Sequence, residues 1–112
     1  MHAAAAAVTV LSIVVSPSGG DTMKHWTLRC GPPGGTLPHA AEACTKLYRL
    51  DTPFKPTPPG TACSQIYGGP QTARVSGIYR GRRILATFTR RDGCETARWR
   101  RVAFLFPGSL SQ

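Results

Sequence analysis

Hydrophobic and polar positions alternate near the start of the chain in a way that is typical of strands. β-Branched residues dominate residues 8–15, and Lys24–Cys30 alternates polar with apolar side chains. Between these two segments lies Pro17–Gly20, which contains the residue types that favour a tight turn. The pattern therefore predicts a β-hairpin that ends at Cys30.

The uncharged stretch Ala3–Val15 also has the length of the apolar region of a signal peptide. We favour the strand, because no Lys or Arg precedes this stretch and because its second half is β-branched. An export signal is then expected upstream of Met1. Either this chain lacks it, or the true start of translation precedes Met1. We expect residues 1–7 to be disordered or the remnant of an export segment. No apolar run approaches the ~20 residues of a membrane span, so no membrane partner is expected.

A helix is predicted after the Gly- and Pro-rich residues 31–35. We expect it to open at Thr36 or Leu37, with Pro38 near its first position, where a missing N–H is harmless. Helical spacing gives this helix one apolar face. The face consists of Ala41, Cys44, Leu47 and Tyr48.

A proline tract, Asp51–Gly60, and the short loop Thr61–Pro70 separate this helix from a second alternating region. The tract holds four prolines and must be extended or turning, which makes it stiff. Alternation then predicts one strand at Thr72–Arg80 and another through Ile84 and Phe88. The tight turn Arg80–Arg82 connects the two strands.

The end of the chain is expected to add one helix and one strand. Cys94–Arg101 predicts a helical turn or two, and Val102–Phe106 a short apolar strand that stops at a Pro-Gly pair. The whole chain then holds about five strands and two short helices. Hairpin-length connections favour an antiparallel sheet with helices on one face. We therefore predict an α+β fold in a single domain of residues 1–112, with residues 107–112 as a flexible tail.

Four cysteines, at positions 30, 44, 63 and 94, stand in this chain of 112 residues. Their spacing does not match a zinc site, so two disulfides and an oxidising compartment are the favoured interpretation. Spacing alone leaves three possible connectivities open. The alternative is four buried thiols in a cytosolic protein. We expect no metal and no cofactor.

The remaining chemistry argues against an enzyme and for a binding or inhibitory module. Only three His and five acidic residues occur, and they form no phosphate loop, metalloprotease motif or calcium loop. A small hydrolase is the least supported class, because no motif sets a nucleophile beside a His and an acid.

Positive charge suggests an alternative function. The chain has 14 Lys and Arg against 5 acidic residues, for a net charge of +9, and residues 74–101 alone contain nine Arg. Beside Tyr79 and Trp99, these arginines could make a basic secreted binding module for nucleic acid or anionic surfaces. No zinc finger, helix-turn-helix or RNP motif supports nucleic acid, which is therefore an unlikely partner. A solvated basic face is the simpler interpretation, with Trp26 and Trp99 in the core or on the sheet.

Five short motifs follow one another along the chain. They are Trp26–Pro38 (WTLRCGPPGGTLP), the helix with Cys44 and Leu47, Ala62-Cys63-x-x-Ile66-Tyr67, Gly77-x-Tyr79-Arg80-Gly81, and Gly93-Cys94-Glu95. This order, with all four cysteines in place, resembles the Streptomyces subtilisin inhibitor family. The resemblance implies a five-stranded antiparallel sheet with two short helices, and the disulfides Cys30–Cys44 and Cys63–Cys94. It also implies a secreted inhibitor of subtilisin-like serine proteases that forms a homodimer through its sheet.

The resemblance also implies which bond the protease attacks. The scissile bond of the family lies two residues after the third cysteine, which makes Gln65–Ile66 the reactive bond here. Before that bond the family commonly carries Met, Lys, Arg or Leu, and this chain carries Gln. Gly68-Gly69-Pro70 is one residue longer than the Asp-Pro that often follows the tyrosine. The remaining protease-contact residues are expected to be Ala62, Cys63, Ser64, Tyr67 and Gly68.

Overall fold

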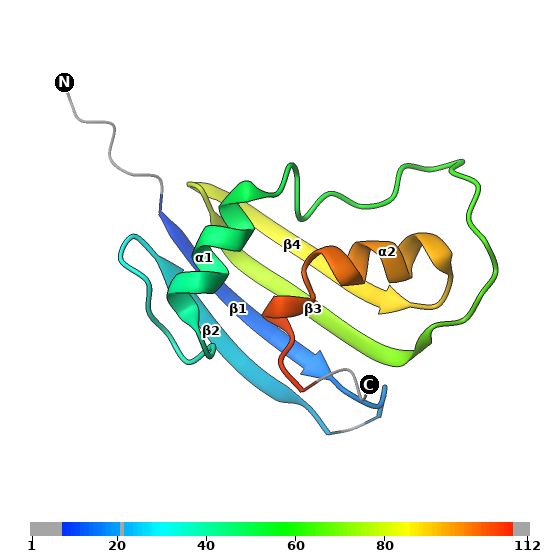
Figure 1. The fold of residues 1–112 in the computed structure, drawn as a ribbon, viewed down its shortest axis with the longest axis horizontal. Coiled ribbons are helices and arrows are strands. Elements are labelled where there is room, and N and C mark those ends of the chain that lie inside the picture. Colours follow the sequence, from blue (N-terminus) through cyan, green and yellow to red (C-terminus); the bar gives the residue numbers. More distant parts are fainter. Residues whose placement is uncertain (1–7, 21, 109–112) are drawn as a thin grey trace.

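A computed structural model describes residues 8–20 and 22–108 of the chain. Four antiparallel strands form one sheet in the order β2-β1-β3-β4, and two α-helices lie over one of its faces (Figure 1). The elements are β1 (Thr9–Ser16), β2 (Lys24–Cys30), α1 (Ala40–Arg49), β3 (Gly69–Tyr79), β4 (Arg82–Arg90) and α2 (Gly93–Arg101). The predicted α+β class with two short helices is confirmed, but the sheet has four strands and not five.

The core lies between the sheet and the helices because successive strand residues point to opposite faces. In β1, Leu11, Ile13 and Val15 are buried, whereas Val10, just before Leu11, is 43% exposed. α1 packs over β2, and α2 packs over β4 (Figure 1). The opposite face carries no helix in the described part of the chain. We call it the open face and define it by Val10, Val14, Ile78 and Leu85.

The fifth strand was predicted wrongly. Val102–Phe106 continues from α2 into a short 3-10 helix at Ala103–Leu105. Val102, Leu105 and Phe106 are buried, at the spacing of one helical face rather than a strand. Phe106 packs against Trp99, with ring centroids 4.7 Å apart, and so closes the core under α2.

The first helix also differs from its prediction, because it begins at Ala40 and not at Thr36 or Leu37. Thr36 and Thr27 of β2 exchange backbone-to-hydroxyl hydrogen bonds of 2.9 and 3.0 Å, which hold this segment beside the strand and outside the helix. The face of α1 shifts accordingly: Ala43, Cys44 and Leu47 are buried, whereas Ala41 is exposed.

The hairpin between β3 and β4 turns through Arg80 and Gly81, as expected. Both residues have positive φ, 51° and 85°, which matches the primed turns that suit the twist of antiparallel strands. The guanidinium of Arg80 lies 4.4 Å from the ring centroid of Tyr48, and its amide donates to Thr9 Oγ1 at 3.1 Å. Burial raises the pKa of the adjacent Tyr79 hydroxyl above its usual value, against the opposing charge of Arg80.

Two disulfides join Cys30 to Cys44 and Cys63 to Cys94, the pairing that the resemblance implied. The first fastens α1 to the end of β2, and the second fastens the loop before β3 to the start of α2. The expectations for residues 1–7 and for the tail beyond Gly108 lie outside the described residues. Among the described residues, no helix has the length and apolar character needed to cross a membrane.

Candidate functional site

The segment 61–68 has no regular secondary structure and leads from the proline tract into β3. In Figure 1 it passes outside the end of β4 and the start of α2, at the opposite end of the sheet from the β3–β4 turn. Gln65, Ile66 and Tyr67 all lie exposed in this segment. Ile66 is 72% exposed and Tyr67 65% exposed, and such large apolar side chains in contact with water mark a surface for a partner.

Three covalent or hydrogen-bonded links hold this loop on both sides of Gln65 and Ile66. The Cys63–Cys94 disulfide spans a Cα–Cα distance of 5.3 Å. One residue further on, the carbonyl of Ser64 accepts a 2.9 Å hydrogen bond from the amide of Gly93. Beyond the exposed pair, the amide of Gly68 donates to the carbonyl of Arg90 at 2.6 Å. The three residues between these links, Gln65, Ile66 and Tyr67, therefore project from a fixed base.

Two glycines allow the loop to lie close against the start of α2. A Cβ on Gly68 would lie 2.6 Å from Thr96 Oγ1, and a Cβ on Gly93 would collide with the side chain of Ser64. Both contacts are tighter than side chains tolerate. The absence of side chains at these two positions therefore permits the backbone links.

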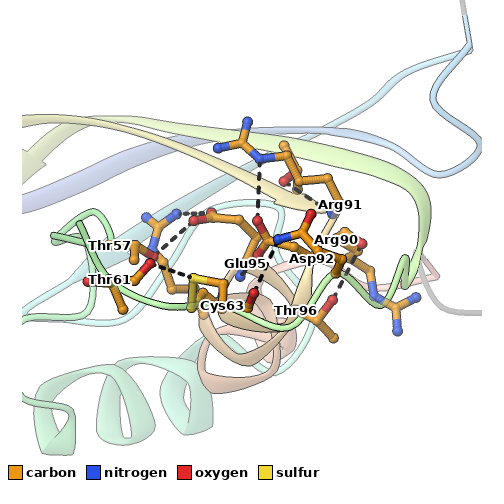
Figure 2. A network of polar contacts seen from close by, with 12 residues as sticks. Thr57, Thr61, Cys63, Arg90, Arg91, Asp92, Glu95 and Thr96 are labelled. Carbon is orange, nitrogen blue, oxygen red and sulfur yellow. Dashed lines mark hydrogen bonds and ion pairs between the residues drawn. A yellow bond between two sulfur atoms is a disulfide. The ribbon is translucent and has the colours of Figure 1, made fainter. Parts of the chain in front are cut away.

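A buried carboxylate binds the proline tract that precedes the loop, as Figure 2 shows. Glu95 is 8% exposed; its Oε2 accepts a 2.9 Å hydrogen bond from Thr57 Oγ1, and its Oε1 lies 2.7 Å from Arg98 Nη1. Arg98 Nε donates to the carbonyl of Lys55 at 3.2 Å, so two residues of the proline tract are bound to α2. Hydrogen bonds that involve a charged group are the stronger kind.

The start of α2 is itself fixed by a helix cap. Asp92 Oδ1 accepts a 2.9 Å hydrogen bond from the amide of Glu95, which satisfies one of the free amides of the first turn. The local sequence Asp92-x-x-Glu95 is the signal that could have revealed this cap in advance. Sequence reasoning missed the role of Glu95, because its partner Thr57 lies 38 positions away.

The subtilisin inhibitor-like family model matches residues 5–90 of the chain. The chain belongs to this family. It is 30% identical over 110 residues to the protease inhibitor SIL-V2 of Streptomyces orinoci, covering 95% of this chain and 99% of that protein. A crystal structure of sermetstatin from Streptomyces caespitosus in complex with Bacillus licheniformis subtilisin has the same fold, with a TM-score of 0.51. At 22% identity, that likeness covers 89% of this chain and 96% of sermetstatin.

Within this subtilisin inhibitor-like chain, the predicted loop residues form one continuous surface segment. Ala62, Ser64, Gln65, Ile66 and Tyr67 are exposed, whereas Cys63 and Gly68 are half-buried where they attach to the rest of the protein. The family match ends at residue 90, before α2 begins. The resemblance implied the Cys63–Cys94 disulfide, whereas the hydrogen bond from Gly93 to Ser64 is known from the structure.

The longer segment after Tyr67 coincides with an irregular start to β3. Gly69 pairs with Arg90, but the next pair is Ala73 with Phe88, so the register shifts between them. Gly69 has a φ of 138°, a conformation that favours glycine. Gly69 and Pro70 therefore lie beside an irregularity in the strand rather than in the exposed loop.

The residues considered for other functions lie elsewhere. Trp99 is completely buried, so it offers no surface on which a nucleobase could stack. His25 lies on the sheet, where its Nε2 is 2.7 Å from Ser12 Oγ. The sulfurs of Cys63 and Cys94 lie close to the carboxylate of Asp92, but they are bonded to each other and are not thiolate ligands.

Proposed function

We propose that this chain is a substrate-like inhibitor of subtilisin-like serine proteases and that Gln65–Ile66 is its reactive bond. The proposal makes the chain a ligand of an enzyme and not an enzyme itself. One observation carries it: the exposed pair is held on one side by Cys63 and the Ser64 carbonyl, and on the other by the Gly68 amide. Membership of the subtilisin inhibitor-like family supports the same conclusion.

A fixed loop inhibits for two physical reasons. A segment that already has its bound shape loses little conformational entropy when it enters the protease cleft. A leaving group that stays attached is also present at high effective concentration, so the acyl-enzyme reseals faster than water hydrolyses it. Cleavage between Gln65 and Ile66 would leave Cys63 in one fragment and Cys94 in the other. Their disulfide would keep the new ends together.

Gln65 favours subtilisin-like enzymes over trypsin. Its side chain is exposed, and its amide donates to the carbonyl of Cys63 at 3.1 Å. A trypsin-like pocket ends in a buried carboxylate, which a neutral glutamine leaves without a cationic partner. A broader, partly apolar pocket accepts the methylene groups and leaves the amide in water. Ile66 and Tyr67 offer apolar area to either enzyme and do not discriminate.

We also propose that the protein is secreted and acts as a homodimer formed through the open face. Two disulfides are typical of an oxidising compartment. On the open face, Leu85 is 70% exposed and Val10 43% exposed, and Val10 pairs with Ile78 across the β1–β3 ladder. A second copy would cover these apolar side chains while the loop at the end of the sheet stays accessible.

Titration of active subtilisin with the oxidised protein tests the function. We expect stoichiometric loss of subtilisin activity, little loss of trypsin activity, and slow appearance of a single cleavage product whose new amino terminus is Ile66. Mass spectrometry under non-reducing and reducing conditions identifies the cut bond. Rapid degradation without inhibition would refute the function, and inhibition with cleavage at another bond would refute the assignment of Gln65–Ile66.

A further inference from the structure

A groove of about 270 Å³ runs beside the exposed loop. One wall is the loop itself, with Ser64, Ile66 and Gly68. The other wall contains Arg90, at the end of β4, and Arg100, on the outer side of α2. A protease that encloses the Gln65–Ile66 bond must therefore also face this groove.

The two arginines of the groove have no acidic partner in the part of the chain that the structure describes. Among the described residues, the nearby carboxylates are used by others: Glu95 pairs with Arg98, and Asp92 lies 3.9 Å from Arg91. Arg90 Nη1 contacts Gln71 Oε1 at 3.3 Å, but its buried Nε has no hydrogen-bond partner in the described part of the chain. The two guanidinium groups that line the groove are therefore left without a counter-charge among the described residues, which favours a ligand that supplies a carboxylate.

We propose that this groove is a second contact site for the protease, in which Arg90 and Arg100 bind carboxylate side chains at the rim of the enzyme's cleft. The inference rests on the proposed inhibitory function and adds a determinant of specificity to it. An acidic rim would pair with the two guanidinium groups, whereas a basic rim would be repelled as the loop docks. Proteases with acidic cleft rims are therefore the preferred targets. A phosphate backbone is disfavoured as the ligand, because the loop side chains themselves form one wall.

The test compares Arg100→Gln with Arg82→Gln. Both arginines are exposed, and each variant loses one positive charge, but Arg82 lies at the far end of β4 from the groove (Figure 1). The association rate constant is measured with Bacillus licheniformis subtilisin, before and after its lysines are succinylated to carboxylates. Because the two variants have the same net charge, a difference between their association rates cannot arise from the overall charge of the inhibitor.

We expect Arg100→Gln to associate about two- to fivefold more slowly than Arg82→Gln with the succinylated enzyme. High salt should remove the difference, and Arg100→Lys should restore most of the rate. Equal rates for Arg100→Gln and Arg82→Gln would overturn the inference while leaving inhibition intact. Failure of the unaltered protein to inhibit would instead refute the proposed function, and the inference with it. Binding of a DNA duplex that Arg100→Gln abolishes, with unchanged association to subtilisin, would assign the groove to nucleic acid and overturn the inference.

Discussion

Removing the Cys63–Cys94 disulfide should convert the inhibitor into a substrate, whereas removing Cys30–Cys44 should not. The proposed reactive bond lies inside the ring that Cys63 and Cys94 close, so this disulfide would be the covalent link between the two products of cleavage. Cys30 and Cys44 both belong to the amino-terminal product. The double variants Cys63→Ser/Cys94→Ser and Cys30→Ser/Cys44→Ser therefore form a matched pair.

The two disulfides stabilise the fold by similar amounts, so the comparison isolates their connectivity. Cys63 and Cys94 are 31 positions apart, and Cys30 and Cys44 are 14 apart. Loss of chain entropy in the unfolded state gives roughly 3.7 kcal/mol for the longer ring and roughly 3 kcal/mol for the shorter one. A difference of less than about 1 kcal/mol cannot by itself make one variant resistant to protease and the other sensitive.

The assay follows residual subtilisin activity and the intact chain over hours, at a temperature where circular dichroism shows both variants folded. The variant without Cys63–Cys94 should inhibit briefly and then be degraded, with separate fragments. The variant without Cys30–Cys44 should inhibit for as long as the unaltered protein. If both variants lost inhibition at the same rate while folded, tethering of the leaving group would not explain resistance.

Three further changes test the loop, its support and the open face. Gln65→Lys should gain inhibition of trypsin without loss of thermal stability, since Gln65 is exposed; unchanged trypsin activity would mean that another bond is attacked. Glu95→Ala should lower the free energy of unfolding by about 3–5 kcal/mol in denaturant titrations, because it leaves a largely buried guanidinium unpaired. Glu42→Ala is the control, because the exposed pair of Glu42 with Lys46 contributes at most about 1 kcal/mol. Equal losses of unfolding free energy in the two variants would contradict a supporting role for Glu95. Leu85→Asp should make the protein monomeric in sedimentation experiments without loss of protease inhibition, and a monomeric unaltered protein would refute dimerisation through the open face.

The strands of the hairpins could be predicted because one face of the sheet is buried and the other is not. That asymmetry gives β3 an alternating pattern that is visible in the sequence, whereas β1, with apolar residues on both faces, was predicted from its β-branched residues. Val102–Phe106 could not be assigned in the same way, because five consecutive apolar residues suit a strand or a buried helix equally. The helical spacing becomes apparent only when Trp99 is included, since it continues through Val102 to Phe106.

The start of α1 shows a second limit of local reasoning. Pro38 suits the first turn of a helix, and nothing nearby in the sequence forbids a helix from Thr36. The hydrogen bonds between Thr36 and Thr27 decide the matter, and they join residues on different elements. Local preference was overridden here by a tertiary contact.

The candidate site was predicted only in part. The position of the exposed loop followed from the resemblance, because its residues are counted from Cys63. Its support did not, because Thr57 reaches the Glu95–Arg98 pair of α2 only when the proline tract folds over that helix. Such a long-range polar network leaves no periodic trace in the sequence.

The pairing of β1 with β3 means that a single cut in the loop divides the fold into two peptides that share one sheet. A cut anywhere in the loop separates β1, β2 and α1 from β3, β4 and α2, and the seven residue pairs between β1 and β3 become an interface between two peptides. Leu11 and Ile13 lie on one side of that seam and Val75 on the other, so neither peptide can bury its apolar face alone. The two peptides could thus be made separately and annealed, and the protease that recognises the junction could join them. Non-natural amino acids could be introduced at positions 65 and 66 by this route.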